Sequence, residues 1–191
     1  MTQLKDKIVI SFVGGPGAGK GTQAELVRKT YDVGYMSAGD LLRQEAAKDT
    51  PLGRKLAEQL RNGEIVAQEV TIGLLKAEIE RQEKQFYIID GFPRQVDQAQ
   101  TFESTIVPFK AALYFYVPDE VLVERCLSRG LTSGRSDDNA ESIKLRLKTF
   151  HTKCEPVNDY FGDRLITING LQTSEKVFED VKKILDGFLK K

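Results

Sequence analysis

Short apolar runs alternate with stretches of helical periodicity along most of this chain. Five runs rich in β-branched and aromatic residues predict strands at Ile8–Val13, around Tyr35–Met36, and at Phe86–Ile89, Ala112–Val117 and Leu165–Ile168. Because the stretches between the runs have a helical period, consecutive strands should lie parallel, with helices crossing between them. The pattern therefore predicts an α/β fold in which helices cover both faces of a parallel sheet.

Two segments depart from this alternation. The first, from Ser37 to about Val66, contains several amphipathic turns before the chain returns to the sheet, and we expect it to form a small helical flap. The second, Gly130–Asn139, has the sequence GLTSGRSDDN, which is too polar for the core, and we interpret it as a mobile lid. Residues 1–36, 67–129 and 140–191 would form the core of one domain that spans residues 1–191.

The stretch Gly14–Thr22, GGPGAGKGT, follows the first predicted strand and leads into a predicted helix at Thr22–Tyr31. Its glycines allow successive backbone N–H groups to point inward, and the helix adds the positive end of its dipole. Lys20 adds a mobile charge within reach of the outer phosphates of a nucleoside triphosphate. The pattern GxxxxGK therefore predicts a phosphate-binding loop, with Gly21 at the usual Ser or Thr position. The GxGxxG spacing of dinucleotide-binding folds is absent.

The charge balance and the cysteines narrow the class of protein. Lys plus Arg and Asp plus Glu number 28 each, so no overall field attracts nucleic acid or an anionic membrane. No apolar run approaches the roughly 18 residues of a membrane span, and the polar start Met1–Lys7 predicts no signal peptide. Cys126 and Cys154 have no metal-ligand spacing and are interpreted as reduced thiols of a cytoplasmic, or also nuclear, protein. The balanced charge also favours a monomer.

Six arginines occur where phosphate chemistry would use them, at Arg43, Arg94, Arg125, Arg129, Arg135 and Arg146. They fall in the flap, after the third strand, on the helix before the lid, in the lid and on the helix beyond it. Guanidinium groups bind phosphoryl oxygens bidentately and stabilise the charge that spreads over a transferring phosphoryl group. We therefore expect these side chains to converge on the glycine loop.

The acidic residues and the one histidine complete the candidate chemistry. Asp90 follows the third strand, at the edge where open α/β sheets bind ligands, and is the expected partner of a magnesium ion, through water. Asp137 and Asp138 either cap the helix after the lid or neutralise the lid arginines. Nothing around His151 indicates a general base, so the chemistry favoured is phosphoryl transfer, which depends on positioning and charge.

Motifs along nearly the whole chain resemble those of the short-lid adenylate and UMP/CMP kinase family. They are GGPGAGKGT, SAGDLLR (Ser37–Arg43), NGEIV (Asn62–Val66), IDGFPR (Ile89–Arg94), ERCLSRG (Glu124–Gly130) and SGRSDDN (Ser133–Asn139). The resemblance implies a P-loop three-layer fold with a five-stranded parallel core, and closure of flap and lid over ATP and a monophosphate. Because the lid lacks the long insertion and cysteines of some relatives, no structural zinc is expected.

The resemblance also implies the role of each site residue. ATP would contact the glycine loop and the base-binding edge through Gly15, Gly17, Ala18, Gly19, Lys20, Gly21, Thr22, Arg125, Arg129 and Gln172. The monophosphate would contact Ala38, Arg43, Glu64, Ile65, Val66, Gly91, Phe92, Pro93, Arg94, Gln98, Arg135 and Arg146. The catalytic set would be Lys20, Arg94, Arg129, Arg135 and Arg146.

Two positions bear on the identity of the monophosphate. Ala38 and the SGRSDDN lid resemble the UMP/CMP branch, whereas Gln98 is typical of adenylate kinases and of a subgroup of uridylate kinases. A side-chain amide has one donor and one acceptor end and can flip to match uracil, cytosine or adenine. We therefore expect a UMP/CMP kinase with appreciable AMP activity, and dCMP is a further candidate substrate. The alternative is an adenylate kinase.

Two other classes of protein fit the sequence less well. A GTPase-like switch would require a guanine-reading NKxD motif, which the chain does not contain. A P-loop kinase of another small molecule would explain the glycine loop, but not the flap, the DGFPR segment and the lid arginines together.

Overall fold

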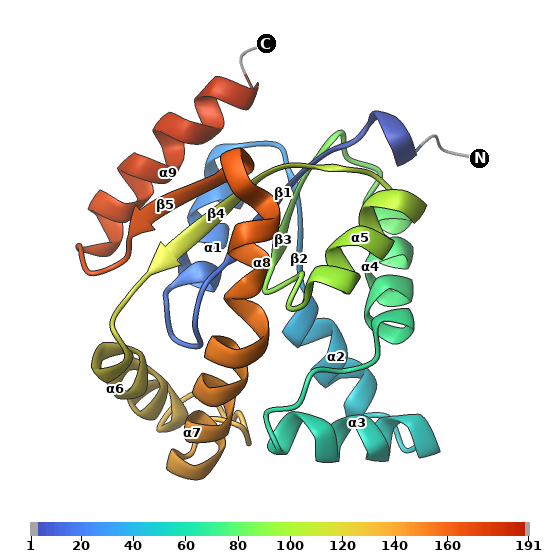
Figure 1. The fold of residues 1–191 in the computed structure, drawn as a ribbon, viewed down its shortest axis with the longest axis vertical. Coiled ribbons are helices and arrows are strands. Elements are labelled where there is room, and N and C mark those ends of the chain that lie inside the picture. The colour runs from blue at the N-terminus through green and yellow to red at the C-terminus, as the bar shows by residue number, and fades with distance from the viewer. Residues whose placement is uncertain (1–3, 190–191) are drawn as a thin grey trace.

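Five parallel strands form one sheet at the centre of the structure, which is a computed structural model describing residues 4–189. The strands are β1 (Ile8–Val13), β2 (Gly34–Ser37), β3 (Phe86–Asp90), β4 (Phe109–Tyr116) and β5 (Leu165–Asn169). Their order in space is β2-β3-β1-β4-β5, and every neighbouring pair is parallel (Figure 1). The predicted α/β fold is therefore confirmed.

The fourth strand is longer than the apolar run that predicted it. It begins at Phe109, where the exposed Lys110 lies between the buried Phe109 and Ala111. A single polar residue on the solvent side of a strand interrupts an apolar run without ending the strand.

The helices lie between the strands as the pattern requires. In residues 4–189 they are α1 (Lys20–Thr30), α2 (Ala38–Ala46), α3 (Pro51–Arg61), α4 (Gln68–Gln82), α5 (Val96–Thr105), α6 (Asp119–Gly130), α7 (Ala140–Thr149), α8 (Pro156–Phe161) and α9 (Ser174–Leu189). Short helical turns occur at Leu4–Asp6, Phe150–Cys154 and Gly162–Arg164. Within the described residues, no helix is both long and apolar enough to cross a membrane.

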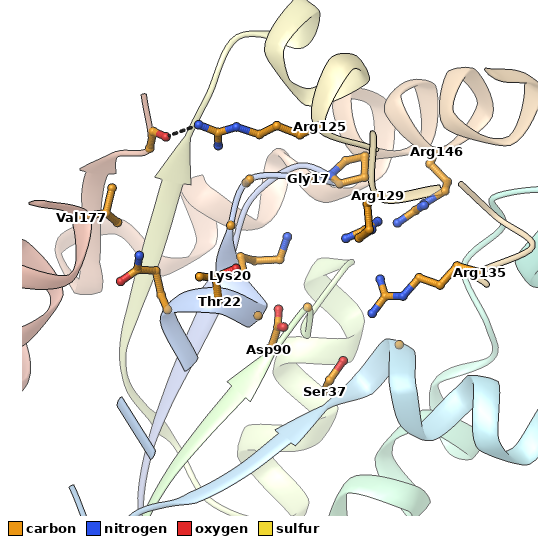
Figure 2. A pocket seen from close by; sticks show the side chains of 18 of the residues that line it. Gly17, Lys20, Thr22, Ser37, Asp90, Arg125, Arg129, Arg135, Arg146 and Val177 are labelled. Carbon is orange, nitrogen blue, oxygen red and sulfur yellow. Dashed lines mark hydrogen bonds between the residues drawn. The ribbon is translucent and has the colours of Figure 1, made fainter. Parts of the chain in front are cut away.

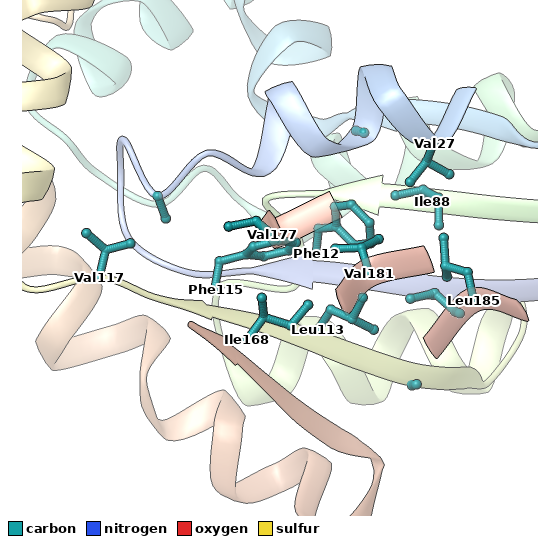
Figure 3. Packing of buried hydrophobic residues seen from close by; sticks show 14 of the residues in the cluster. Phe12, Val27, Ile88, Leu113, Phe115, Val117, Ile168, Val177, Val181 and Leu185 are labelled. Atoms are coloured by element: carbon teal, nitrogen blue, oxygen red, sulfur yellow. The ribbon is translucent and has the colours of Figure 1, made fainter. Parts of the chain in front are cut away.

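Alternate residues of each central strand face opposite layers. In β1, Ile10 and Phe12 belong to one hydrophobic cluster, and Val9 and Val13 belong to the other. The first cluster lies under α1 and α9, whose apolar side chains meet Phe12, Leu113 and Phe115 of the sheet (Figure 3). The second lies under α4, α5 and α8. Both layers are largely apolar because the residues of a central parallel strand are covered on both faces, and the buried Ser11 of β1 is satisfied by donating to the Phe92 carbonyl.

Helices α2 and α3 stand beyond the end of the sheet and have a small core of their own (Figure 1). Leu42, Leu56 and Val66 are its buried members, and Ser37 and Thr50 cap the two helices through backbone N–H groups three residues on. Leu52, one of the apolar positions of this segment, is 41% exposed and does not belong to that core. A core of this size leaves the segment dependent on few contacts, which suits an element that moves.

Candidate active site

The glycine loop joins β1 to α1 and has the left-handed backbone that only glycine adopts without strain. Gly17 and Gly19 have φ values of 81° and 92°, and Gly19 directly precedes the first helical residue, Lys20. A Cβ atom on Gly17 would lie 2.9 Å from both the Cys126 sulfur and the Leu122 carbonyl of α6. The loop is therefore packed tightly against α6, and its N–H groups are held in place before any ligand binds.

Lys20 extends back over this loop. Its Nζ donates hydrogen bonds to the carbonyls of Gly14 and Gly15, at 2.9 and 2.8 Å. Burial lowers the pKa of Lys20 to about 8, and the nearby arginines act in the same direction while Asp90 opposes them. A buried ammonium among guanidinium groups gains stability from a bound anion, so the loop is suited to a polyphosphate.

A cavity of about 550 Å³ opens above the glycine loop. All six arginines singled out in the sequence line it, together with Lys20, Thr22, Asp90 and Gln172. Figure 2 shows Arg129, Arg135 and Arg146 reaching toward Lys20 and Asp90 from one side, while Arg125 donates to the Gly170 carbonyl on the other. The expected convergence of arginines is thus present in the structure.

Three aspartates, Asp40, Asp137 and Asp138, form ion pairs with these arginines. Asp40 of α2 lies 3.2 Å from Arg135, and Asp138 lies 2.6 Å from Arg129 and 2.9 Å from Arg146. Burial favours a raised pKa for Asp138, but the hydrogen bonds and charges of Arg129 and Arg146 together outweigh it and lower the pKa overall. Carboxylates thus stand where phosphate oxygens would meet the same guanidinium groups.

The two aspartates of the lid do not cap the helix that follows. Asn139 is the N-cap of α7, and its side-chain oxygen accepts a hydrogen bond from Ser142 N at 2.9 Å. Asp137 and Asp138 are each only 6% exposed, although the segment had been expected to stay outside the core. They are buried because Arg146 reaches both carboxylates, so they neutralise arginines on α6 and α7 rather than cap a helix.

Asp90 ends β3 at the floor of the larger cavity and is 8% exposed. Burial raises the pKa of this carboxyl, and the Lys20 ammonium counteracts the rise. Within residues 4–189, no group of three or more His, Cys, Asp or Glu side chains could hold a metal by itself. A single carboxylate beside a phosphate site nevertheless suits Mg²⁺, which is commonly held by one or two carboxylates, substrate phosphates and water.

A second cavity, of about 100 Å³, lies next to the first. Lys20, Arg43, Arg94 and Arg146 border both cavities, and Glu64 and Pro93 border only the smaller one. Its remaining walls include Leu60 from α3 and Phe150, Cys154 and Asn158 from the chain after α7. Four cationic side chains thus border both cavities, of which the larger contains most of the glycine loop and the smaller reaches the flap residues Leu60, Gly63 and Glu64.

Six of the predicted contact residues line neither cavity in this conformation: Gly15, Ala38, Ile65, Val66, Phe92 and Gln98. Gln98 is 2% exposed, and both ends of its amide are engaged. Its Oε1 accepts from Arg94 N at 2.9 Å, and its Nε2 donates to the Val66 carbonyl at 3.4 Å. The expected free flip of this amide is therefore opposed, because a flip would place donor against donor and acceptor against acceptor.

The histidine lies away from the site, whereas both cysteines lie beside it. His151 is on the surface, where Asp119 and Glu155 flank its ring nitrogens at 2.9 and 3.0 Å. Cys126 is buried beneath the glycine loop and Cys154 is half-buried, and neither forms a disulfide within the described residues. This placement agrees with a reaction that uses no histidine base.

Two residues near the site, Asp40 and Tyr35, were assigned no role from the sequence. Asp40 had a signal only as part of the SAGD motif, and its contact with Arg135 links two segments 95 residues apart. Tyr35 had been assigned only to a strand, yet its hydroxyl donates to Asp90 Oδ2 at 3.3 Å. Contacts between distant segments depend on strand order and register, which an apolar pattern does not specify.

Comparison with known proteins agrees with this geometry. The family model described as adenylate kinase matches residues 12–166. The uridylate kinases of Saccharomyces cerevisiae and Schizosaccharomyces pombe are each 44% identical to this chain, over 93% and 95% of it and over 90% and 98% of their own lengths. Adenylate kinase isoenzyme 1 of Caenorhabditis elegans is 43% identical over 93% of this chain and 87% of its own length. The chain belongs to the adenylate kinase family.

Proposed function

We propose that this enzyme, a nucleoside monophosphate kinase, transfers the γ-phosphoryl group of ATP to UMP or CMP and also accepts AMP. The observation that carries the proposal is the border between the two cavities, where Lys20, Arg43, Arg94 and Arg146 belong to both. Two phosphorylated substrates bound on either side would bring their phosphates to this one cluster of cations. Transfer between two nucleotides needs such a shared anion site.

ATP occupies the larger cavity in this proposal. The backbone N–H groups of the glycine loop and Lys20 hold its β and γ phosphates, and Arg125 and Gln172 mark the side where its base lies. Lys20 exchanges the carbonyls of Gly14 and Gly15 for phosphate oxygens. This exchange is favourable because a charged acceptor binds an ammonium more strongly than a neutral carbonyl does.

The monophosphate occupies the flap side, with its phosphate on Arg43 and Arg94. Burial lowers the pKa of Arg94, which remains a cation and gains from a dianionic partner. The NGEIV segment and Gly91 to Arg94 surround the nucleoside. Gln98 supports this wall by tying the Arg94 backbone to Val66.

The reaction is a direct in-line transfer without a covalent enzyme intermediate. Arg129, Arg135 and Arg146 release their aspartate partners and stabilise the charge on the transferred group. When bound with ATP, Mg²⁺ neutralises phosphate charge, and Asp90 is the residue that would hold it, through water. Guanidinium groups in a site closed to water act without reorganisation during the transfer.

Residues 37–66 and 130–139 act as the flap and the lid. They already touch in this conformation, through Asp40 with Arg135 and Arg43 with Asp137. A third contact joins the flap to α7, where Ser142 Oγ donates to the Arg61 carbonyl at 3.1 Å. Substrates must enter before these contacts form, so opening of both segments precedes binding.

The names of the relatives support both pyrimidine and adenine monophosphates as acceptors. Uridylate kinases and an adenylate kinase are almost equally similar to this chain, at 44% and 43% identity. Ala38 favours the pyrimidine branch by the resemblance of the SAGD motif, whereas Gln98 favours the adenylate branch or the glutamine-bearing uridylate kinases. With Gln98 held by Arg94 and Val66, the size of the nucleoside pocket decides between the bases.

The test is a comparison of initial rates with UMP, CMP, dCMP and AMP at a fixed ATP concentration. We expect kcat/KM to be highest for UMP or CMP and measurable for AMP. A strong preference for AMP over both pyrimidines would assign the protein as an adenylate kinase instead.

The cellular compartment and the oligomeric state are also part of the proposal. The unpaired Cys126 and Cys154 suit a reducing compartment, and we place the enzyme in the cytoplasm, as a monomer.

A further inference from the structure

Tyr35 carries a hydroxyl to the edge of the sheet where the nucleotide phosphates would lie. It belongs to β2, whose register with β3 pairs Tyr35 with Ile88 and Ser37 with Asp90. Its side chain therefore runs two residues along the sheet, about 7 Å, and its Oη donates to Asp90 Oδ2 at 3.3 Å. Within residues 4–189, no other side chain donates a hydrogen bond to this carboxylate.

The backbone of Tyr35 is fixed by a side chain from another element. Gln82, the last residue of α4, accepts from Tyr35 N through Oε1 at 2.9 Å and donates to the Tyr35 carbonyl through Nε2 at 2.7 Å. These two bonds take the place of a neighbouring strand on the outer side of β2. They hold the point from which the tyrosine side chain departs.

Gly34 makes this clamp possible. A Cβ atom there would lie 2.4 Å from the Tyr87 ring and 2.7 Å from Gln82 Oε1. Any other residue would displace either the strand or the amide, because contacts this short are repulsive.

The ring of Tyr35 is held as well. The guanidinium carbon of Arg28, on α1, lies 5.6 Å from the ring centroid, within the range of a cation–π contact. Backbone, ring and hydroxyl thus each have a partner, from α4, α1 and β3. Three separate contacts on one half-buried tyrosine indicate that its direction matters, rather than its volume alone.

We infer that Tyr35 is a positioning residue, whose hydroxyl holds the Asp90 carboxylate in the orientation that the magnesium ion of the bound nucleotide requires. The hydrogen bond occupies one carboxylate oxygen, Oδ2, and limits rotation of the group, which leaves Oδ1 available to a metal-bound water. Preorganised ligands bind a metal more tightly because no side-chain freedom is lost on binding. The inference rests on the proposed function only for the presence of a metal–nucleotide at Asp90.

The variant Tyr35→Phe removes the hydroxyl and keeps the ring. Its effect is measured by equilibrium binding of a non-hydrolysable ATP analogue in Mn²⁺, a paramagnetic substitute for Mg²⁺, and in EDTA. The ratio of the Kd in EDTA to the Kd in Mn²⁺ is the metal effect. We expect the strengthening of binding by the metal to fall about tenfold, the lower end of the effect of losing one hydrogen bond to a charged group. Binding of the metal-free analogue should change less than about twofold. The Mg²⁺ concentration for half-maximal rate should rise by the same factor as the metal effect falls.

Tyr31→Phe is the matched control, because Tyr31 also donates to an aspartate, Asp186 Oδ1 at 2.7 Å, but does so between α1 and α9. It should leave the metal effect unchanged. If Tyr35→Phe weakens metal-free and metal-bound nucleotide equally, or weakens neither, the inference is wrong.

A second variant guards against a folding defect in Tyr35→Phe. Gln82→Met releases the Tyr35 backbone while leaving the hydroxyl in place, and should reduce the metal effect in the same direction, by a smaller factor. An unchanged metal effect in a folded Gln82→Met protein would contradict the inference. If the wild type binds the metal–nucleotide but phosphorylates no monophosphate, the proposed function fails, while the binding measurements still decide the role of Tyr35.

Discussion

Lys20 concentrates the chemistry of the glycine loop in one side chain. Its ammonium is held by two backbone carbonyls, and burial brings its pKa to about 8. The uncompensated charge is a cost to the ligand-free protein that a bound triphosphate removes. The residue is therefore more important for binding and turnover than for the fold.

Replacing Lys20 by Met should lower kcat/KM by about 10²- to 10³-fold, the usual effect of losing one preorganised charge contact to the reacting group. Circular dichroism and thermal melting should show a folded protein, because no buried acid depends on Lys20 alone. Lys29→Met, at an exposed position of the same helix, is the control and should retain full activity. Equal turnover in wild type and Lys20→Met would exclude the assigned role.

The contacts of Gln98 were only partly predictable from the sequence. The family resemblance implied that Gln98 and Arg94 both contact the monophosphate, and the structure has the two residues in contact with each other. The amide itself was expected to be free to flip, but it is held by backbone groups of Arg94 and Val66. The second contact comes from a segment 32 residues away, and a motif says nothing about the partners of a side chain across the fold.

At the scale of elements, the flap and the lid meet through ion pairs, of which the pair between Asp40 and Arg135 is half exposed. Asp40 lies between Arg43 of its own helix and Arg135 of the lid. Exposed or half-exposed pairs contribute about 0.2–1 kcal/mol each, so these contacts bias closure without locking it. Substrate phosphates can therefore replace the carboxylates.

The variant Asp40→Asn should open the ligand-free protein. Loss of a pair of this strength lowers the ratio of closed to open molecules by up to about fivefold, and small-angle X-ray scattering should report a larger radius of gyration. Asp49→Asn is the control, because Asp49 pairs with Arg54 inside the flap and not with the lid. The same expansion in both variants would show that the contact with Arg135 is not responsible.

His151 links two elements, because it faces Asp119 at the start of α6 and Glu155 in the turn before α8. Hydrogen bonding to Glu155 raises the pKa of His151 above its ordinary value of 6.5, and Asp119 adds to the rise. A raised pKa in the folded state means that the stabilisation is complete below pH 6.5 and is lost as the pH rises through the folded value.

Urea unfolding between pH 6 and 8.5 should therefore show a free energy of unfolding that declines with pH by less than about 1 kcal/mol, since the pair is exposed to solvent. His151→Gln should remove this decline. An identical pH profile in the variant would assign the change to other groups.

Most of the strands and helices could be predicted from the sequence. All five strands were predicted from short apolar runs, because buried parallel strands need apolar residues on both faces. The lid was harder, since the burial of Asp137 and Asp138 depends on arginines from neighbouring helices. Polarity alone predicts exposure, and only paired charges override it.

At the scale of the whole molecule, stability and chemistry occupy different regions. The two large hydrophobic clusters lie on the faces of the sheet, whereas the cavities lie beyond the carboxyl ends of its strands. Helix α9 closes one face with Val177, Val181 and Leu185. Substitutions in this layer should lower the free energy of unfolding without changing the contacts with substrates.

Leu185→Ala should lower the free energy of unfolding by about 3 kcal/mol, the usual result of leaving a cavity at a fully buried leucine. KM values at 25 °C should stay within about twofold of the wild type. Leu52→Ala, where the leucine is 41% exposed, is the matched truncation and should cost less than about 1 kcal/mol. Comparable losses in urea denaturation at the two positions would contradict the described packing.

The amide of Gln82 has a consequence for the protein in concentrated solution. As the outermost strand on its side, β2 would otherwise present the free N–H and carbonyl of Tyr35 to any extended chain nearby. Since Gln82 already bonds both groups, a second molecule finds no template for pairing there. Substitution of Gln82 should therefore make the protein more prone to self-association on storage, even under conditions where its monomer remains folded.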